Sequence, residues 1–230
     1  MKKIGILGGI SPESSLEYYR LFIDLAKERE PTGKYPELII YSLNFEDFCR
    51  PVTEGKDEQA VTLLRDKLVA LEKAGADFAM MASNTPHKYY QRLTDQISIP
   101  LLSIVESTAE AASENGFSKV GLLGTEVTMS GDFYSEVFSN KGIKVVTPEE
   151  NEQEYIHERI MNELVNGEIV DSTRKRLVEI TREMRRKKGV EAIILGCTEL
   201  PLILSEEETG FPVLDTEKIH VNKAYSIAAD

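Results

Sequence analysis

The chain has 230 residues, of which 41% are hydrophobic and 29% are charged, and these proportions are typical of a soluble globular protein. Its formal net charge of −12 opposes binding to nucleic acid or to an anionic membrane surface, so we expect neither as a partner. Its apolar runs are too short for a transmembrane helix, and two cysteines are too few for a disulfide framework. We therefore expect a cytoplasmic protein.

Short apolar runs alternate with amphipathic segments along the chain. In chain order, the expected strands are residues 3–7, 38–41, 78–82, 120–123, 144–146 and 192–195. The expected helices between them include residues 13–28, 59–74, 103–115 and 172–188. This alternation predicts an α/β fold with mainly parallel sheets flanked by helices.

One pattern of residues occurs twice, with an offset of about 115 residues, which is too long a period for a solenoid. Residues 5–9 resemble 121–125, residues 75–85 resemble 189–198, and residues 99–103 resemble 211–215. The pattern predicts two pseudo-symmetric half-domains. We expect residues 1–98 with 211–230 in the first and residues 99–210 in the second.

The paired landmarks lie at the expected carboxyl ends of strands, which is where ligands bind in open α/β sheets. Two halves related by a pseudo-two-fold axis would place the landmarks around one cleft. The candidate residues at these strand ends are Gly9, Ser83, Thr125 and Cys197. We therefore expect the active site in the cleft between the half-domains.

Cys197 is the strongest candidate for chemistry, because it follows a buried strand and precedes residues that could open a helix. A helix N-terminus lowers the pKa of a thiol, and a modest shift would make Cys197 a usable base near neutral pH. The alternative is that Cys197 is a small buried residue without chemical function.

Ser83, Asn84 and Thr85 supply two hydroxyls and an amide at the matching strand end. These side chains could hold a carboxylate or relay a proton, or they could only cap a helix that begins near Pro86.

Gly9 and Ser11 follow the first expected strand, where the backbone could approach a ligand. The loop lacks the glycine pattern of a dinucleotide site or a phosphate loop. The alternative is a tight turn in which Ser11 caps the following helix and Pro12 occupies its first position.

The remaining candidates are polar side chains near the expected cleft. The hydroxyls of Thr125 and Thr128 could bind carboxylate oxygens or only cap a helix, and Thr198 adjoins Cys197. Asn44, Arg50 and Lys88 could fix a distal anionic group, with Arg50 favoured for its bidentate contacts, and His87 lies near the cleft in this arrangement. A solvated surface role is the alternative for each of the first three, and a packed or capping role is the alternative for His87. The histidines show no zinc-ligand spacing, so we expect no metal.

Several motifs together resemble the aspartate/glutamate racemase family: residues 8–14, 83–87, 121–125 and 196–199, followed by Asp215 and Thr216. The resemblance implies a homodimeric enzyme that uses no pyridoxal phosphate, metal or nucleotide. It also implies two cysteines on opposite sides of a small-molecule substrate, an acidic amino acid, one removing the Cα proton and the other donating a proton. Cys197 matches the second cysteine, whereas Ser83 stands where the family pattern has the first.

A serine at position 83 matters because a hydroxyl is far less acidic than a thiol and is a poor base near neutral pH. Three activities remain open. The protein could be a racemase of aspartate or glutamate that is slow or biased in direction. It could be a one-thiol enzyme, a decarboxylase or a cis–trans isomerase of a dicarboxylate. It could also be an amino-acid-binding protein with impaired catalysis.

Overall fold

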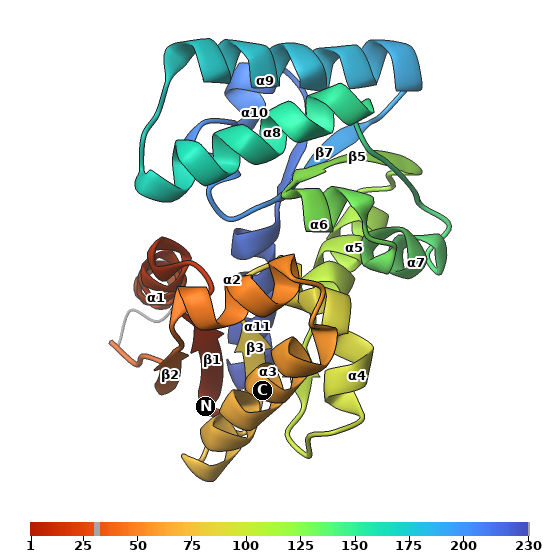
Figure 1. The fold of residues 1–230 in the computed structure, drawn as a ribbon. Coiled ribbons are helices and arrows are strands. Elements are labelled where there is room, and N and C mark those ends of the chain that lie inside the picture. The colour runs from red at the N-terminus through yellow and green to blue at the C-terminus, as the bar shows by residue number, and fades with distance from the viewer. Residues whose placement is uncertain (30–32, 230) are drawn as a thin grey trace. The chain divides into compact units, whose positions relative to one another are not determined.

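The structure is a computed structural model that describes residues 1–29 and 33–229. The chain divides into two compact units, Met1–Ile104 with His220–Asp230 and Val105–Ile219. Each unit contains a sheet of four parallel strands with helices packed against it, so the predicted α/β class is confirmed (Figure 1). Among the described helices, none combines the length and apolar character needed to cross a membrane.

The sheet of the first unit has the strand order β2-β1-β3-β4, and every neighbouring pair is parallel. Its strands are β1 (Ile4–Gly8), β2 (Leu38–Ser42), β3 (Phe78–Met81) and β4 (Leu101–Leu102). Its helices are α1 (Pro12–Arg29), α2 (Phe45–Thr53), α3 (Asp57–Lys73), the 3-10 helix η1 (Thr85–Tyr89), α4 (Tyr90–Thr94) and most of α11 (Thr216–Ala229).

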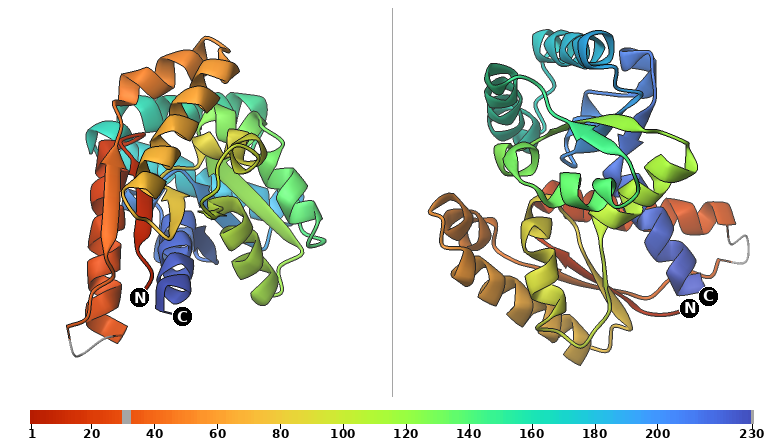
Figure 2. Two further views of the ribbon diagram at one scale, coloured as in Figure 1. Left: turned by 90° about the horizontal axis from the view of Figure 1, so that it is seen from below. Right: turned by 90° about the vertical axis from the view of Figure 1, so that its right-hand side faces the viewer.

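Both faces of this sheet are covered by helices, which explains why its strands read as continuous apolar runs in the sequence. Leu7 and Met81 pack with α2, α3 and α4 on one face, whereas Ile6 packs with α1 and α11 on the other. The Lys2 N–H donates a hydrogen bond to the Ala228 carbonyl at 2.9 Å, so the two ends of the chain lie side by side (Figure 2).

The sheet of the second unit has the order β6-β5-β7-β8 and is also parallel throughout. Its strands are β5 (Lys119–Gly124), β6 (Lys144–Val146), β7 (Ala192–Gly196) and β8 (Val213–Asp215). Its helices are α5 (Ile104–Glu114), α6 (Glu126–Ser130), α7 (Phe133–Ser139), α8 (Glu150–Asn162), η2 (Leu164–Asn166), α9 (Asp171–Glu183), the π-helical turn η3 (Met184–Lys188), the 3-10 helix η4 (Leu200–Leu202) and α10 (Glu206–Thr209).

One face of the second sheet packs against α6, α8 and α9. Leu123 and Ile193 of the sheet share a buried cluster with Ile156 of α8 and Leu177 of α9. Figure 1 shows α8 and α9 beside each other across this face. Gly121 makes room for the cluster, because a Cβ at this position would lie only 2.6 Å from Cδ1 of Ile193.

The repeated sequence pattern has the same structural cause in both units. In the first unit, the Asp77 carboxylate accepts a hydrogen bond from the Lys3 N–H at 2.6 Å, just before β1. In the second, the Glu191 carboxylate accepts hydrogen bonds from the N–H groups of Ser118 and Lys119 at 2.6 and 2.9 Å, where β5 begins. The acidic residue of each copy therefore satisfies the backbone at the start of the neighbouring strand.

The chain passes between the units after residues 104 and 219, whereas we expected the changes after residues 98 and 210. Strand pairing explains the difference. The Pro100 carbonyl accepts a hydrogen bond from the Ala79 N–H at 2.8 Å, and the Pro212 carbonyl accepts one from the Ile193 N–H at 3.0 Å. Each proline therefore leads into a short strand, β4 or β8, that extends the sheet before the chain leaves it.

Candidate functional site

The turn after β1 is held together by its own side chains. The Gly9 N–H donates a hydrogen bond to Ser15 Oγ at 2.8 Å, and the Ser15 hydroxyl donates one to the Ser11 carbonyl at 3.0 Å. Ser11 Oγ accepts a hydrogen bond from the Ser14 N–H at 3.4 Å, as expected of a residue that caps α1. The Gly9 N–H is thus engaged within the turn, and the substrate-binding role expected of Gly9 stays a prediction.

The second strand end of this unit carries Ser83, Asn84 and Thr85. Because β1 and β3 are parallel neighbours, this segment and the turn after β1 lie at the same edge of the sheet. Asn84 is buried, and its side chain does not cap η1, so the simple capping role considered for it is not observed. Within the described ranges, the hydroxyl of the half-buried Ser83 has no hydrogen-bond partner. Ser83 therefore has an uncommitted hydroxyl at the expected strand end.

His87 holds the Ser83 segment in place. Its Nδ1–H donates a hydrogen bond to the Ser83 carbonyl at 2.9 Å, and its Nε2 accepts one from the Ile104 N–H at 3.1 Å. Burial lowers the pKa of His87 from 6.5 to about 4, so the ring is neutral at pH 7. Both ring nitrogens are occupied. His87 is therefore a buried residue that supports this strand end, and the substrate-binding role expected of it stays a prediction.

The corresponding edge of the second unit is built from close glycine packing. Gly124 of β5 lies opposite Gly196 of β7, and a Cβ on Gly124 would lie 2.9 Å from the Gly196 carbonyl oxygen. The Thr128 side chain covers this pair, because its Cγ2 would lie 3.0 Å from the same Cβ. The hydroxyls of Thr125 and Thr128 are 3.1 Å apart. The sequence-predicted residues Thr125, Thr128 and Cys197 thus share one sheet edge.

The thiol of Cys197 donates a hydrogen bond to a residue that the sequence analysis overlooked. Its Sγ lies 2.9 Å from Oε2 of Glu199, a side chain that is only 3% exposed. The Thr198 hydroxyl donates to the same oxygen at 3.0 Å. Glu199 is the last residue of the motif Gly-Cys-Thr-Glu, so the sequence shows that it lies two residues after Cys197 along the chain. The sequence did not reveal that its side chain turns back towards the thiol.

The expected lowering of the Cys197 pKa is wrong. Burial and the negative charge of Glu199 raise the pKa of the thiol well above its usual value of 9.0. The segment after Cys197 forms only the three-residue 3-10 helix η4, which begins at Leu200. A single short turn cannot supply the dipole of a full helix. Cys197 is therefore a neutral, hydrogen-bonded thiol in the resting protein.

The candidates for binding a distal anionic group lie in and around α2 and η1. Arg50 is exposed on α2. Asn44 caps the same helix, because its side chain accepts a hydrogen bond from the Glu46 N–H at 3.0 Å. Lys88 forms an ion pair with Asp57 at 3.1 Å. Two of the three candidates are therefore engaged, Asn44 as a helix cap and Lys88 in an ion pair. Arg50 forms no ion pair within the described chain.

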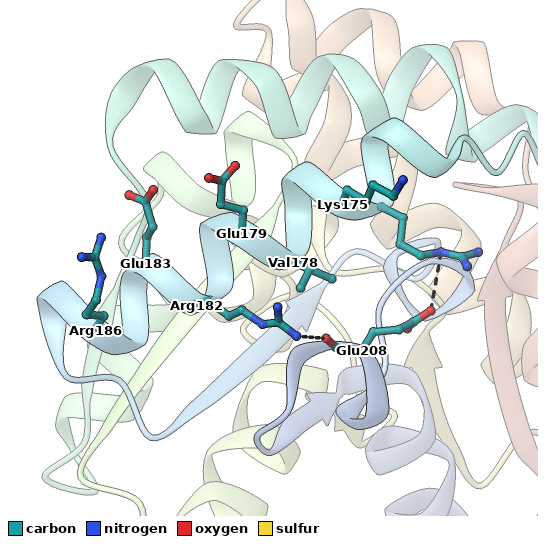
Figure 3. Close-up of a pocket in the computed structure, with 8 residues that line it drawn as sticks. Lys175, Val178, Glu179, Arg182, Glu183, Arg186 and Glu208 are labelled. Carbon is teal, nitrogen blue, oxygen red and sulfur yellow. Dashed lines mark hydrogen bonds and ion pairs between the residues drawn. The ribbon is translucent and has the colours of Figure 1, made fainter.

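A groove of ≈ 540 Å³ lies away from these strand ends, along α9 (Figure 3). Its arginines are bound to Glu208: the Arg182 guanidinium donates a hydrogen bond to the Glu208 backbone carbonyl at 3.0 Å, and Arg174 lies 3.5 Å from the Glu208 carboxylate. None of the sequence-predicted site residues lines this groove. In the described part of the chain, no cluster of three or more histidine, cysteine or acidic side chains is arranged as a metal site.

Comparisons with known proteins point to one family. The model of the family described as Asp/Glu/Hydantoin racemase matches residues 7–224. The chain is 28% identical over 223 residues to the broad specificity amino-acid racemase of Bacillus subtilis (strain 168), with 93% of this chain and 92% of that protein covered.

Solved structures agree with the sequence comparison. An aspartate racemase homologue from Pyrococcus horikoshii OT3 is 39% identical, with a TM-score of 0.88 and 100% of both chains covered. The aspartate racemase of Picrophilus torridus has a TM-score of 0.82, with 100% of this chain and 95% of that chain covered. Because the Picrophilus torridus enzyme is only 24% identical to this chain, the comparison with it supports the fold alone.

Proposed function

Because the chain belongs to the Asp/Glu/hydantoin racemase family, we propose that it is a cofactor-independent racemase of an acidic amino acid, aspartate or glutamate. The observation that carries the proposal is the thiol of Cys197 at the end of β7, hydrogen-bonded to the buried carboxyl group of Glu199. The matching strand end in the other unit carries Ser83. A relative that is a broad specificity amino-acid racemase supports the reaction class.

In the proposed reaction, Cys197 exchanges a proton with one face of the substrate Cα and Ser83 serves the other face, directly or through a water molecule. The Cα–H of an amino acid is very weakly acidic, so the site must also stabilise the carbanion that forms. Oriented hydroxyls are suited to this task because they need little reorganisation as charge develops. We assign this role to Thr125, Thr128 and Thr85, and we assign the distal carboxylate to Arg50.

Racemisation of aspartate and glutamate, followed by chiral chromatography, tests the proposal. We expect each active amino acid to racemise, and we expect Cys197→Ala to abolish the reaction. Cys197→Ser should lower the rate by ~10²-fold or more, because a hydroxyl replaces the thiol as acid and base. In the same assay, Arg50→Ala should raise the KM more than it lowers kcat. Unchanged turnover in Cys197→Ala would exclude the proposed chemistry.

A second candidate is the one-thiol enzyme, and the neutral state of Cys197 favours it. A thiol whose pKa is raised well above 9.0 is a proton donor at pH 7, which is what protonation after decarboxylation requires. Release of carbon dioxide from a substituted malonate, without racemisation of any acidic amino acid, would select this candidate. Ligand-induced thermal stabilisation without either reaction would select the amino-acid-binding protein. The homodimeric state and the cytoplasmic location stay predictions.

A further inference from the structure

Four aromatic rings form a continuous cluster in the first unit, which we call the ring cluster: Tyr18, His87, Tyr90 and His220. His87 and Tyr90 are stacked, with ring centroids 5.9 Å apart. His220 meets His87 edge to face at 6.1 Å and meets Tyr18 in the same way at 5.9 Å. The rings belong to α1, η1, α4 and α11, so segments that are distant in the sequence meet in one cluster.

Two members of the ring cluster bind the backbone of β4, the last strand before the chain leaves the first unit. The Tyr90 hydroxyl donates a hydrogen bond to the Leu101 carbonyl at 2.7 Å. The Nε2–H of His220 donates one to the Leu102 carbonyl at 3.2 Å. Because β4 has only two residues, its pairing with β3 fixes a short stretch of backbone. The two side chains add to this pairing on consecutive residues.

The ring cluster also holds both points at which the chain crosses between the units. Ile104 is the last residue of the first unit before the chain passes to the second, and its N–H donates to Nε2 of His87 at 3.1 Å. His220 is the first residue after the chain returns, and its Nδ1 accepts a hydrogen bond from the Tyr18 hydroxyl at 2.9 Å. One cluster therefore fixes both covalent connections on the side of the first unit.

We propose that the ring cluster anchors the hinge between the two units. A hinge consists of a few residues at the ends of elements that absorb changes in backbone dihedral angles, while the packed parts on either side stay rigid. The cluster holds the chain up to Ile104 and again from His220, which confines rotation to the residues after Ile104 and before His220. This role does not depend on which reaction the protein catalyses.

The same cluster includes one strand end of the candidate site. The Nδ1–H of His87 donates a hydrogen bond to the Ser83 carbonyl at 2.9 Å, while Nε2 of the same ring accepts from the Ile104 N–H. A displacement of Ile104 at the hinge therefore acts on the backbone of Ser83 through a single side chain.

Tyr18→Phe combined with Tyr90→Phe tests the proposal, because each change removes one hydrogen bond of the ring cluster and keeps the ring. Tyr89→Phe is the matched control, since the Tyr89 hydroxyl donates at 2.6 Å to Asp57 of α3 and not to a connecting segment. A hydrogen bond to a carboxylate is roughly twice as strong as one between neutral groups, so the single control substitution removes a comparable interaction.

Amide hydrogen exchange of the connecting segments is the first readout. In the double variant we expect exchange in residues 101–106 and 217–222 to be ~10-fold faster or more than in the unaltered protein, because these segments open more often when their side-chain hydrogen bonds are lost. We expect the same segments to exchange at the unaltered rate in Tyr89→Phe.

The distance between spin labels, one in each unit, is the second readout. The labels are attached through Lys73→Cys and Glu154→Cys, at two exposed positions, in a Cys49→Ser and Cys197→Ser background. We expect the distribution of distances to be broader in the double variant than in the labelled protein with intact tyrosines, and to be unchanged in the Tyr89→Phe control.

Faster exchange spread evenly over the first unit would mean that the rings only stabilise the fold, and it would overturn the proposal. Equal effects in the control would do the same. An unchanged distance distribution would also overturn it, even with faster exchange in the connecting segments, because these segments would then not govern the motion of the units. Both readouts are independent of turnover, so neither failure bears on the proposed racemase function.

Discussion

Position 9 requires a glycine for two reasons, its backbone conformation and its close packing. Its φ of 80° is in the left-handed region, and a Cβ there would overlap the carbonyl oxygen of Leu43, the residue that follows β2. Its N–H is bonded to Ser15. The turn after β1 therefore depends on a glycine for its shape, and this shape places the N-cap Ser11 at the start of α1.

Gly9→Ala should destabilise the protein more than Gly55→Ala does. Both glycines have positive φ, so each alanine costs about 1–2 kcal/mol for the left-handed conformation. A Cβ at Gly55 would have no atom within 4 Å. Any additional loss of stability in Gly9→Ala therefore measures the clash with Leu43. Urea unfolding of the two variants gives this comparison. Equal losses of stability would mean that the turn moves to accommodate the methyl group.

At the residue scale, the sequence predicted Cys197 and Ser83 because each ends a copy of the same pattern. It did not predict the partner of the thiol, because the position of the Glu199 side chain depends on how the chain turns after β7. The same limit applies to His87, whose burial and hydrogen-bond partners the sequence did not reveal. One of its two ring hydrogen bonds comes from the N–H of Ile104, which is distant in the sequence.

Among the elements of the first unit, a pair of buried histidines links five segments. His87 joins η1 to the start of α5. His220 of α11 donates from Nε2 to the Leu102 carbonyl of β4 at 3.2 Å and accepts from the Tyr18 hydroxyl of α1 at 2.9 Å. The two rings are 6.1 Å apart. Burial lowers the pKa of both, so this network stabilises the unit only while both rings are neutral.

The network predicts a loss of stability in mild acid. Below pH 6.5 the unfolded chain protonates His87, whereas the folded protein resists protonation down to about pH 4. Stability therefore falls as the pH decreases through this window, by about 3 kcal/mol for His87 when the transition is complete.

His87→Asn tests this expectation by urea unfolding at pH 7 and pH 4.5. At pH 7 the variant should be less stable than the unaltered protein by ~1–3 kcal/mol, because the Ile104 N–H loses its acceptor. At pH 4.5 this gap should narrow by ~2–3 kcal/mol, because the variant no longer has a histidine that must stay neutral. An equal difference in stability between the two proteins at both pH values would refute the assignment of His87 as a neutral residue of the folded protein.

At the level of elements, the sequence located β1, β3 and β7 well, because their apolar runs are buried throughout. It missed β4 and β8 as strands. These strands have only two and three residues, and their pairing with β3 and β7 decides where the chain leaves each sheet. This is why the boundaries between the two units lie further along the chain than the sequence predicted.

For the whole molecule, the two units repeat one plan. Both sheets have the same strand order, and an acidic side chain anchors the start of the central strand in each. The two candidate residues for proton transfer occupy matching strand ends but differ in chemistry, one a thiol with a carboxyl partner and the other a hydroxyl. The proposed racemase therefore combines two units of the same strand order with different chemical groups at their matching strand ends.

Cα deuteration of each enantiomer in D2O, compared between the unaltered protein and Ser83→Cys, tests this asymmetry most directly. We predict that the unaltered protein exchanges one enantiomer much faster than the other. We predict that Ser83→Cys accelerates the slow enantiomer by ~10²-fold or more, because a thiol replaces a hydroxyl on that face. The fast enantiomer should change little. Equal exchange of both enantiomers by the unaltered protein, or no gain in Ser83→Cys, would contradict the account.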